Sequence, residues 1–205
     1  MEAKLEIQIS KFEAFILAGG ASSRMGADKA QLLLDDQTFV ERLAATLRMV
    51  TDSVSLVGGS SIISQLPTIA DVYPKWGALG GLHAALSACR REWAIVVACD
   101  LPLVTAELFQ RLASLDTGYD AVVPIQPDGR PQPLAALYRA ESCHRVATEL
   151  IEKGQRRPLD LLQSVHTRWV DFVEIANLAQ AERFFVNINT PEDYYGIIRV
   201  LREPD

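Results

Sequence analysis

Near the N-terminus the sequence runs Phe15-Ile16-Leu17-Ala18-Gly19-Gly20-Ala21-Ser22-Ser23-Arg24-Met25-Gly26-Ala27-Asp28-Lys29. An apolar run typical of a buried strand stops at two adjacent glycines, and a loop of small residues follows. Glycines allow positive φ and close approach of the backbone, so successive N–H groups can converge on an anion. Arg24 and Lys29 add positive charge to this loop. The stretch therefore predicts a strand that ends in a phosphate-binding loop.

The spacing of the loop differs from that of two commoner glycine-rich loops. Five residues separate Gly20 from Gly26, and Lys29 does not directly follow a glycine. No G-x-G-x-x-G pattern can be read either. The loop is therefore neither a Walker A motif nor a Rossmann fingerprint.

Strands and helices alternate along the rest of the chain. Apolar runs predict strands at about 12–17, 54–57, 68–72, 93–98, 119–124, 134–138, 167–173 and 184–188. Amphipathic segments predict helices at about 39–50, 82–91, 105–115, 141–153 and 159–165, and a last helix after Thr190-Pro191-Glu192-Asp193. We therefore expect an α/β fold: a single, Rossmann-like domain over residues 1–205, with a mostly parallel sheet and helices on both faces.

Composition narrows the class of protein. The 205 residues carry 20 Lys and Arg against 26 Asp and Glu, and the net charge of −6 argues against nucleic acid as a partner. The three cysteines have the spacing of neither a disulfide framework nor a zinc site, which favours a reducing cytoplasm. No stretch resembles a signal peptide or a membrane helix. We expect a cytoplasmic protein that does not bind membranes.

Asp100 is the candidate metal ligand. It lies between the apolar run 93–98 and Pro102, where a carboxylate is costly unless it binds a metal or caps the next turn. Ligands of open α/β sheets bind at the carboxyl ends of strands, where both Asp100 and the glycine loop are expected. Phosphoryl transfer needs mainly positioning and charge neutralisation, which Mg²⁺, Arg24 and Lys29 can supply. The pattern predicts nucleotide chemistry that needs no protein nucleophile.

Several motifs taken together resemble a known family, the molybdenum cofactor guanylyltransferases (the MobA family). They occur in order over residues 12–196: Leu17-Ala18-Gly19-Gly20, Ser23-Arg24-Met25-Gly26, Asp28-Lys29, the glycines of 77–81, Cys99-Asp100-Leu101-Pro102, and Phe185-Val186-Asn187-Ile188-Asn189-Thr190-Pro191-Glu192-Asp193. The resemblance implies that the phosphate of molybdopterin, which can carry molybdenum, attacks the α-phosphorus of GTP and releases pyrophosphate. It also leaves maturation proteins of molybdoenzymes as candidate partners.

The resemblance also implies site residues. The nucleotide would be bound by a set of residues from the first half of the chain: Leu17, Ala18, Gly19, Gly20, Lys29, Asp71 and Asp100. Arg24, Lys29 and Asp100 would be catalytic, and Asp100 would hold Mg²⁺. The nucleotide half would span about 12–125 and the acceptor half about 126–205.

Three positions bear on substrate choice. Cytidylyl relatives tend to have Ala-Ala-Gly where this chain has Ala18-Gly19-Gly20, and the missing Cβ at Gly19 leaves room for a purine, which favours GTP. Gly58 stands where the family often has a nucleotide-contacting Asn. Gln132-Pro133 stands where members of the family have a His-Pro or similar pair.

The acceptor side leaves alternatives open. Asn187 and Asn189 either line the acceptor or metal site or only hold the turn before the last helix. Arg156 either binds the acceptor phosphate or is solvated. Gln132 is the remaining candidate for binding the acceptor. The three histidines do not have the spacing of metal ligands.

Two further functional classes fit the same sequence. One is nucleotidyl transfer to another acceptor, as in a cytidylyl variant or an enzyme of corrinoid precursors or sugar phosphates. The other is a non-catalytic, nucleotide-binding regulatory subunit, which would have no need for the carboxylate at Asp100.

Overall fold

The strand that precedes the glycine loop, β1 (Phe12–Leu17), lies inside a seven-stranded sheet. The computed structural model describes residues 9–18, 32–34, 36–58 and 65–202. The strand order is β5-β4-β1-β6-β8-β7-β9. The other strands of this sheet are β4 (Val54–Val57), β5 (Thr68–Ile69), β6 (Trp93–Ala98), β7 (Ala121–Pro124), β8 (Ala135–Arg139) and β9 (Thr167–Val170). All neighbours pair in parallel except β8, which is antiparallel to both β6 and β7, so the prediction of a mostly parallel sheet is confirmed.

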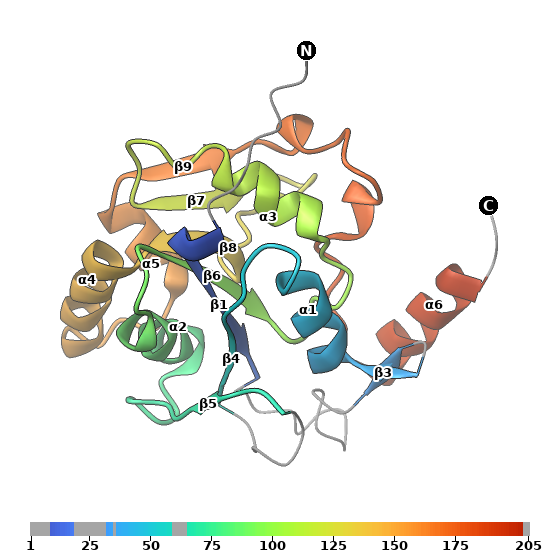
Figure 1. Cartoon of the computed structure of the whole chain (residues 1–205), viewed down its shortest axis with the longest axis horizontal. Coiled ribbons are helices and arrows are strands. Elements are labelled where there is room, and N and C mark those ends of the chain that lie inside the picture. The colour runs from blue at the N-terminus through green and yellow to red at the C-terminus, as the bar shows by residue number, and fades with distance from the viewer. Residues whose placement is uncertain (1–8, 19–31, 35, 59–64, 203–205) are drawn as a thin grey trace.

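Helices cover both faces of the sheet (Figure 1). One face packs on α1 (Phe39–Leu47) and α3 (Ala106–Ala113), and the other on α2 (Gly77–Ala88), α4 (Ala140–Glu152) and α5 (Pro158–Ser164). Alternate residues of β1 face opposite sides, so Ile16 belongs to the first core and Phe15 to the second. The buried run of β6 is wholly apolar, as expected of a central strand that helices cover on both sides.

The C-terminal helix α6 (Pro191–Arg202) packs on a third, smaller cluster at the periphery of the molecule (Figure 1). Its partner is the hairpin of β2 (Leu33–Leu34) and β3 (Gln37–Thr38), and the Tyr194 hydroxyl donates to the Leu33 carbonyl at 2.7 Å. Thr38 also caps α1 through a capping box with Glu41, as expected for a helix that begins after Thr38. Among the described residues, no helix is both long enough and apolar enough to cross a membrane.

The predicted strand at 184–188 is wrong. Within the described part of 171–189 the chain forms two short 3₁₀ helices, η4 (Phe172–Glu174) and η5 (Ala181–Arg183), and irregular segments. Phe184 is buried in the first core cluster, whereas Ile188 is buried in the third. The apolar residues therefore anchor a segment that crosses between two clusters, and they do not form one face of a strand.

Several element boundaries also differ from expectation, including the strand predicted over 167–173, which ends at Val170. The strand predicted over 68–72 ends at Ile69, and Val72 is exposed. The helix predicted from residue 82 begins five residues earlier, at Gly77, so it includes the glycines that were expected to precede it. Thr105 occupies the N-cap position of α3 as predicted, but its side chain makes no capping hydrogen bond.

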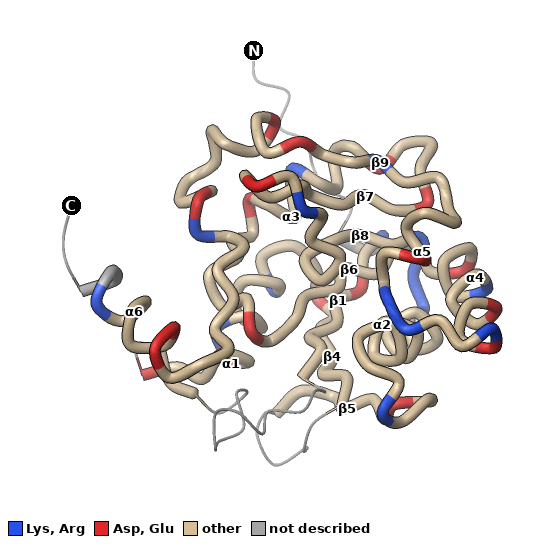
Figure 2. The backbone as a smooth tube through the Cα atoms, turned by 180° about the vertical axis from the view of Figure 1, so that it is seen from behind, with Lys and Arg blue, Asp and Glu red and all other residues tan. Residues whose placement is uncertain are grey.

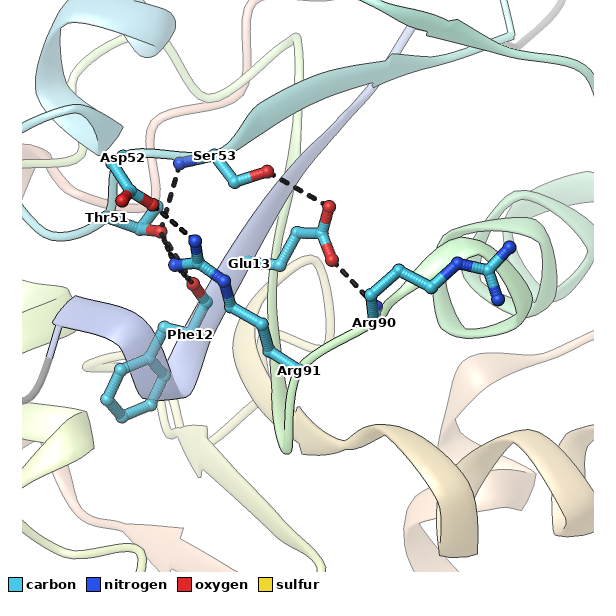
Figure 3. Close-up of polar contacts among 7 residues, drawn as sticks. All are labelled: Phe12, Glu13, Thr51, Asp52, Ser53, Arg90 and Arg91. Atoms are coloured by element: carbon cyan, nitrogen blue, oxygen red, sulfur yellow. Dashed lines mark hydrogen bonds and ion pairs between the residues drawn. The ribbon is translucent and has the colours of Figure 1, made fainter.

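A polar network joins the amino ends of the central strands (Figure 3). The Arg91 guanidinium donates to the Phe12 carbonyl at 2.7 Å and to the Thr51 hydroxyl at 3.2 Å, and it pairs with Asp52 at 2.5 Å. The Glu13 carboxylate accepts one hydrogen bond from the start of β4 and another from the turn after α2. These contacts hold β1, β4 and β6 in register at the edge of the sheet opposite their carboxyl ends.

Candidate functional site

The carboxyl ends of four parallel strands meet at one edge of the sheet. Leu17 at the end of β1 pairs with Val57 of β4 and with Ala98 of β6, and Val57 pairs in turn with Ile69 of β5. After β1 the chain builds β4 and β5 on one side and then crosses to place β6 on the other. The boundary between β1 and β6 is thus a topological switch point, where ligands of open α/β sheets bind.

Leu17 and Ala18 lie at this switch point. Leu17 is buried, and the Ala18 N–H donates to the Val57 carbonyl at 2.9 Å, which carries the parallel ladder one residue past the strand. Gly19, Gly20, Arg24 and Lys29 lie outside the described residues. The described chain therefore enters the predicted phosphate-binding loop at the edge where a ligand of this fold class is expected.

Asp100 follows the strand next to β1. The Cys99 N–H donates to the Leu17 carbonyl at 3.0 Å, and the Leu101 N–H donates back to the Ala98 carbonyl at 3.1 Å, which closes a tight turn around Asp100. Its backbone carbonyl accepts from the Ile188 N–H at 3.0 Å. Asp100 is half-buried. The carboxylate that the sequence singled out therefore belongs to a turn held from two sides, directly beside the end of β1.

Asp71 lies farther across the same edge. It follows the end of β5 by two residues and is half-buried. One strand, β4, separates β5 from β1, which corresponds to about 10 Å at the usual strand spacing. Between them, Gly58 has φ +69° and donates its N–H to the Ile69 carbonyl at 3.0 Å. Gly58 thus adopts a left-handed turn at a position that favours glycine or Asn.

The start of α2 reaches this edge as well, because a helix that follows a parallel strand begins at the carboxyl edge. Trp76 precedes the helix, and its indole N–H donates to the Gln155 carbonyl at 2.8 Å. The Arg156 guanidinium stacks over the Trp76 ring at 4.5 Å from its centroid. Figure 2 shows further basic segments on the side of the molecule that α2, α4 and α5 cover. Arg156 is therefore held beside the start of α2 by an aromatic contact.

Asn187 and Asn189 flank Ile188, whose N–H binds the Asp100 carbonyl. The Asn187 amide donates to the Phe185 carbonyl at 3.4 Å, and the Asn189 N–H donates to the Asp193 carboxylate at 2.9 Å. The second contact belongs to the turn that starts α6, so the turn-holding interpretation has a structural basis. The same segment lies against the Asp100 turn, so its placement also suits a role in the site.

Gln132 approaches the site from the other side of β6. It is buried, and its N–H donates to the Pro124 carbonyl at 2.9 Å. Two residues later, the Leu134 carbonyl accepts from the Ala98 N–H at 2.9 Å, which places the start of β8 level with the end of β6. The fold thus brings Gln132 and the Asn187–Asn189 segment to the same edge as Asp100.

Asp100 is the candidate carboxylate ligand for a divalent cation at this edge. Among the described residues no group of three or more His, Cys, Asp and Glu side chains could hold a metal ion. Mg²⁺ is commonly bound by one or two carboxylates together with substrate phosphates and water. A single carboxylate beside the start of a predicted phosphate-binding loop fits that donor set.

A groove of about 410 Å³ lies elsewhere, between the end of α2 and the start of α4. Its lining includes four arginines, Arg90, Arg91, Arg139 and Arg145. Arg139 pairs in register with Trp93 at the amino end of β6, so the groove lies at the edge opposite Asp100. It is therefore separate from the candidate nucleotide site.

Sequence reasoning did not single out Trp76 or Arg42. Trp76 orients Arg156, and Arg42 of α1 donates from Nε to the Pro102 carbonyl in the loop after Asp100, at 3.1 Å. A Trp directly before a glycine-rich segment was a visible signal. No local pattern marks Arg42, because its partner lies 60 residues away.

Comparisons with known proteins agree with this geometry. The family model described as a MobA-like NTP transferase domain matches residues 14–168. A probable molybdenum cofactor guanylyltransferase of Carboxydothermus hydrogenoformans is 33% identical over 187 residues, with 90% of this chain and 94% of the relative covered. Another such protein, from Pelotomaculum thermopropionicum, is 34% identical over 181 residues, covering 87% of each chain.

Solved structures share the fold. Molybdopterin-guanine dinucleotide biosynthesis protein A from Archaeoglobus fulgidus superposes with a TM-score of 0.79 at 24% identity, covering 92% of this chain and 98% of that one. The 2-C-methyl-D-erythritol 4-phosphate cytidylyltransferase of Thermus thermophilus gives a TM-score of 0.67 at 17% identity, covering 93% and 98%. The fold is thus common to transferases that differ in nucleotide and acceptor.

Proposed function

This chain belongs to the family of MobA-like NTP transferases, and we propose that it transfers GMP from GTP to the phosphate of molybdopterin, which can carry molybdenum. The products are molybdopterin guanine dinucleotide and pyrophosphate. The observation that carries the proposal is the pairing of Leu17 with Ala98, which sets Asp100 directly beside the start of the glycine loop. The names of the relatives with 33% and 34% identity supply the substrates.

The proposed reaction is an in-line displacement at the α-phosphorus. An oxygen of the acceptor phosphate forms the new P–O bond, and the bond to the bridging oxygen of pyrophosphate breaks. Leu17, Ala18, Gly19 and Asp71 bind the nucleoside end, and the loop from Gly20 to Lys29 binds the triphosphate. Arg24 and Lys29 neutralise charge that develops on the phosphates. When bound, Mg²⁺ supplies further charge neutralisation, and Asp100 is the residue that holds it.

The acceptor occupies the part of the edge beyond Asp100. Gln132, Asn187 and Asn189 border it, and Arg156 offers a guanidinium that suits a phosphate group. The stacking of the Arg156 guanidinium on Trp76 restricts where its positive charge lies.

A turnover assay tests the proposal. Protein, molybdopterin, Mg²⁺ and either GTP or CTP are incubated, and released pyrophosphate is measured. We expect release with GTP and much less with CTP. A preference for CTP would favour the cytidylyl alternative, and no release with molybdopterin would favour another phosphorylated acceptor.

Asp100→Asn separates catalysis from binding. We expect turnover to fall by about 10²-fold or more while GTP binding, measured by calorimetry, survives in part. Asp52→Asn is the matched control, because Asp52 is exposed and pairs with Arg91 at the opposite edge. Parallel loss of binding and turnover in Asp100→Asn would count against the metal role, and unchanged turnover would refute a catalytic one. GTP binding without turnover in the unmodified chain would favour a regulatory subunit.

A further inference from the structure

The loop after Asp100 is buried, which is unusual for a connection between a strand and a helix. Leu101 is 1% exposed, and Leu103 and Val104 are each 3% exposed. A buried loop cannot rely on water to satisfy its backbone groups, so each carbonyl needs a partner inside the protein. Pro102 has no N–H, which leaves its carbonyl as the one polar backbone group that it contributes.

Arg42 supplies the partner of that carbonyl. Its Nε donates to the Pro102 carbonyl at 3.1 Å from the first turns of α1. Phe39, one turn earlier on the same helix face, is buried in one cluster with Leu103. Two consecutive contacts, one polar and one apolar, thus join α1 to the segment that begins at Asp100.

We propose that Arg42 is a positioning residue for Asp100, fixing the loop after β6 so that the Asp100 carboxylate faces the metal and nucleotide. The inference rests on the proposed function, in which Asp100 holds Mg²⁺. The Asp100 turn is closed by the bond from Leu101 to Ala98 and is held at its carbonyl by Ile188. Arg42 binds the Pro102 carbonyl, two residues after Asp100, which leaves the turn little freedom to rotate.

Arginine suits this task because a charged donor makes a stronger hydrogen bond to a buried carbonyl than a neutral one. The contact also has a consequence for the whole site. The chain passes from the glycine loop through the hairpin β2–β3 to α1, so Arg42 ties the element that follows that loop to the carboxylate after β6.

Metal binding provides a direct test that does not depend on turnover. Mn²⁺ is titrated into the protein saturated with GTP, and free Mn²⁺ is measured by electron paramagnetic resonance. For Arg42→Met, which keeps an unbranched side chain out to the position of Nε but removes the donor, we expect the Kd for Mn²⁺ to rise about 10-fold or more. GTP affinity without metal should stay within about twofold, and the Mg²⁺ concentration for half-maximal turnover should rise in parallel.

Two further variants test whether the change in Mn²⁺ affinity is specific to the donor at position 42. Arg48→Met changes an exposed arginine at the C-terminal end of the same helix and should leave the Kd for Mn²⁺ unchanged. Arg42→Lys keeps a charged donor, so it should recover part of the lost affinity. If circular dichroism shows that Arg42→Met does not fold, Arg42→Leu, which also lacks a donor, takes its place. A Kd for Mn²⁺ equal to that of the unmodified protein in the folded variant without the donor overturns the inference.

Titration of Asp100→Asn with Mn²⁺ tests the metal role of Asp100 separately from the positioning role of Arg42. If Mn²⁺ binds weakly to Asp100→Asn but normally to Arg42→Met, the positioning role of Arg42 is rejected and the metal role of Asp100 stands. Normal Mn²⁺ binding in Asp100→Asn rejects the metal role of Asp100, and with it the reason for positioning that residue.

Discussion

His83 is the most deeply buried histidine among the described residues, and its surroundings fix its protonation. The Thr148 hydroxyl donates to the His144 carbonyl at 3.0 Å, so it acts as the acceptor for His83 Nε2, 3.1 Å away. Nε2 therefore carries the hydrogen, and Nδ1 is buried without a hydrogen-bond partner in the described part of the chain. Burial, and secondarily the nearby His144, lowers the pKa of His83 to about 4. The sequence shows no metal-ligand spacing around this histidine, and the structure buries it between α2 and α4.

The lowered pKa of His83 predicts a loss of stability in acid. In the unfolded chain this imidazole has its ordinary pKa of about 6.5, so protonation favours the unfolded state as the pH falls below that value. The contribution is lost progressively between about pH 6.5 and pH 4. Urea unfolding at pH 7.5 and 4.5 measures it: the decrease in unfolding free energy should be smaller in His83→Gln by about 1 to 3 kcal/mol.

A second histidine provides the control for that measurement. His166 is exposed and lies outside the contact between α2 and α4, so His166→Gln is the matched histidine substitution. The same pH dependence in all three proteins would show that His83 is not the group responsible.

At the scale of elements, α2 shows why a glycine-rich segment can be helical. A Cβ at Gly80 would lie 2.8 Å from the Trp76 Cβ and 3.1 Å from the Tyr73 carbonyl oxygen. At Gly81, the nearest atom would be the Leu17 Cδ1 at 3.6 Å, an ordinary contact. Gly80 therefore lets the turn 73–76 approach the helix closely, whereas Gly81 only faces the end of β1.

Adjacent alanine substitutions in α2 should have opposite effects. Gly80→Ala must displace the backbone around Trp76, which should lower the unfolding free energy by about 1 to 2 kcal/mol even after the gain in helix propensity. Gly81→Ala meets no such obstacle and should be neutral or stabilising by up to about 1 kcal/mol. Urea denaturation of both variants measures the difference. Equal stability of the two would contradict the proposed close approach at Gly80.

At the scale of the whole molecule, burial is unevenly distributed. β1 and β6 are covered by helices on both faces, and every residue of β6 is buried. In the described part of the chain, the buried residue of α6, Ile197, belongs to the small cluster around Leu34, Phe39 and Ile188. Local opening has the lowest free energy where few buried apolar contacts must be broken. The sheet and α6 should therefore open in separate steps.

Native-state hydrogen exchange tests this separation. Amides of β1 and β6 should exchange most slowly, through global unfolding, and those of α6 fastest among the helices. Tyr194→Phe removes the hydroxyl that donates to the Leu33 carbonyl, so it should accelerate exchange in α6 and leave β1 and β6 unchanged. A common exchange rate for α6 and β6 would show that they unfold together.

Much of the fold was predictable because its signals are local. The buried runs of β1 and β6 were located residue for residue, and Thr38 marked the start of α1, since strand burial and helix capping depend on neighbours in sequence. Placing Asp100 and the glycine loop at one edge followed from the rule for parallel sheets. The roles of Gly19, Gly20, Arg24 and Lys29 stay predictions, because these residues lie outside the described chain.

Local sequence patterns therefore specify the fold class, the main strands and the edge that carries the candidate site. The reversed direction of β8 and the irregular path of 184–188 become visible only in the folded chain. The same holds for the contacts of Arg42 with Pro102 and of Ile188 with Asp100. The difference lies in the range of the interactions. A helix cap or an apolar run is specified by adjacent residues, whereas the two contacts join segments 60 or more residues apart and form only once the whole core has packed.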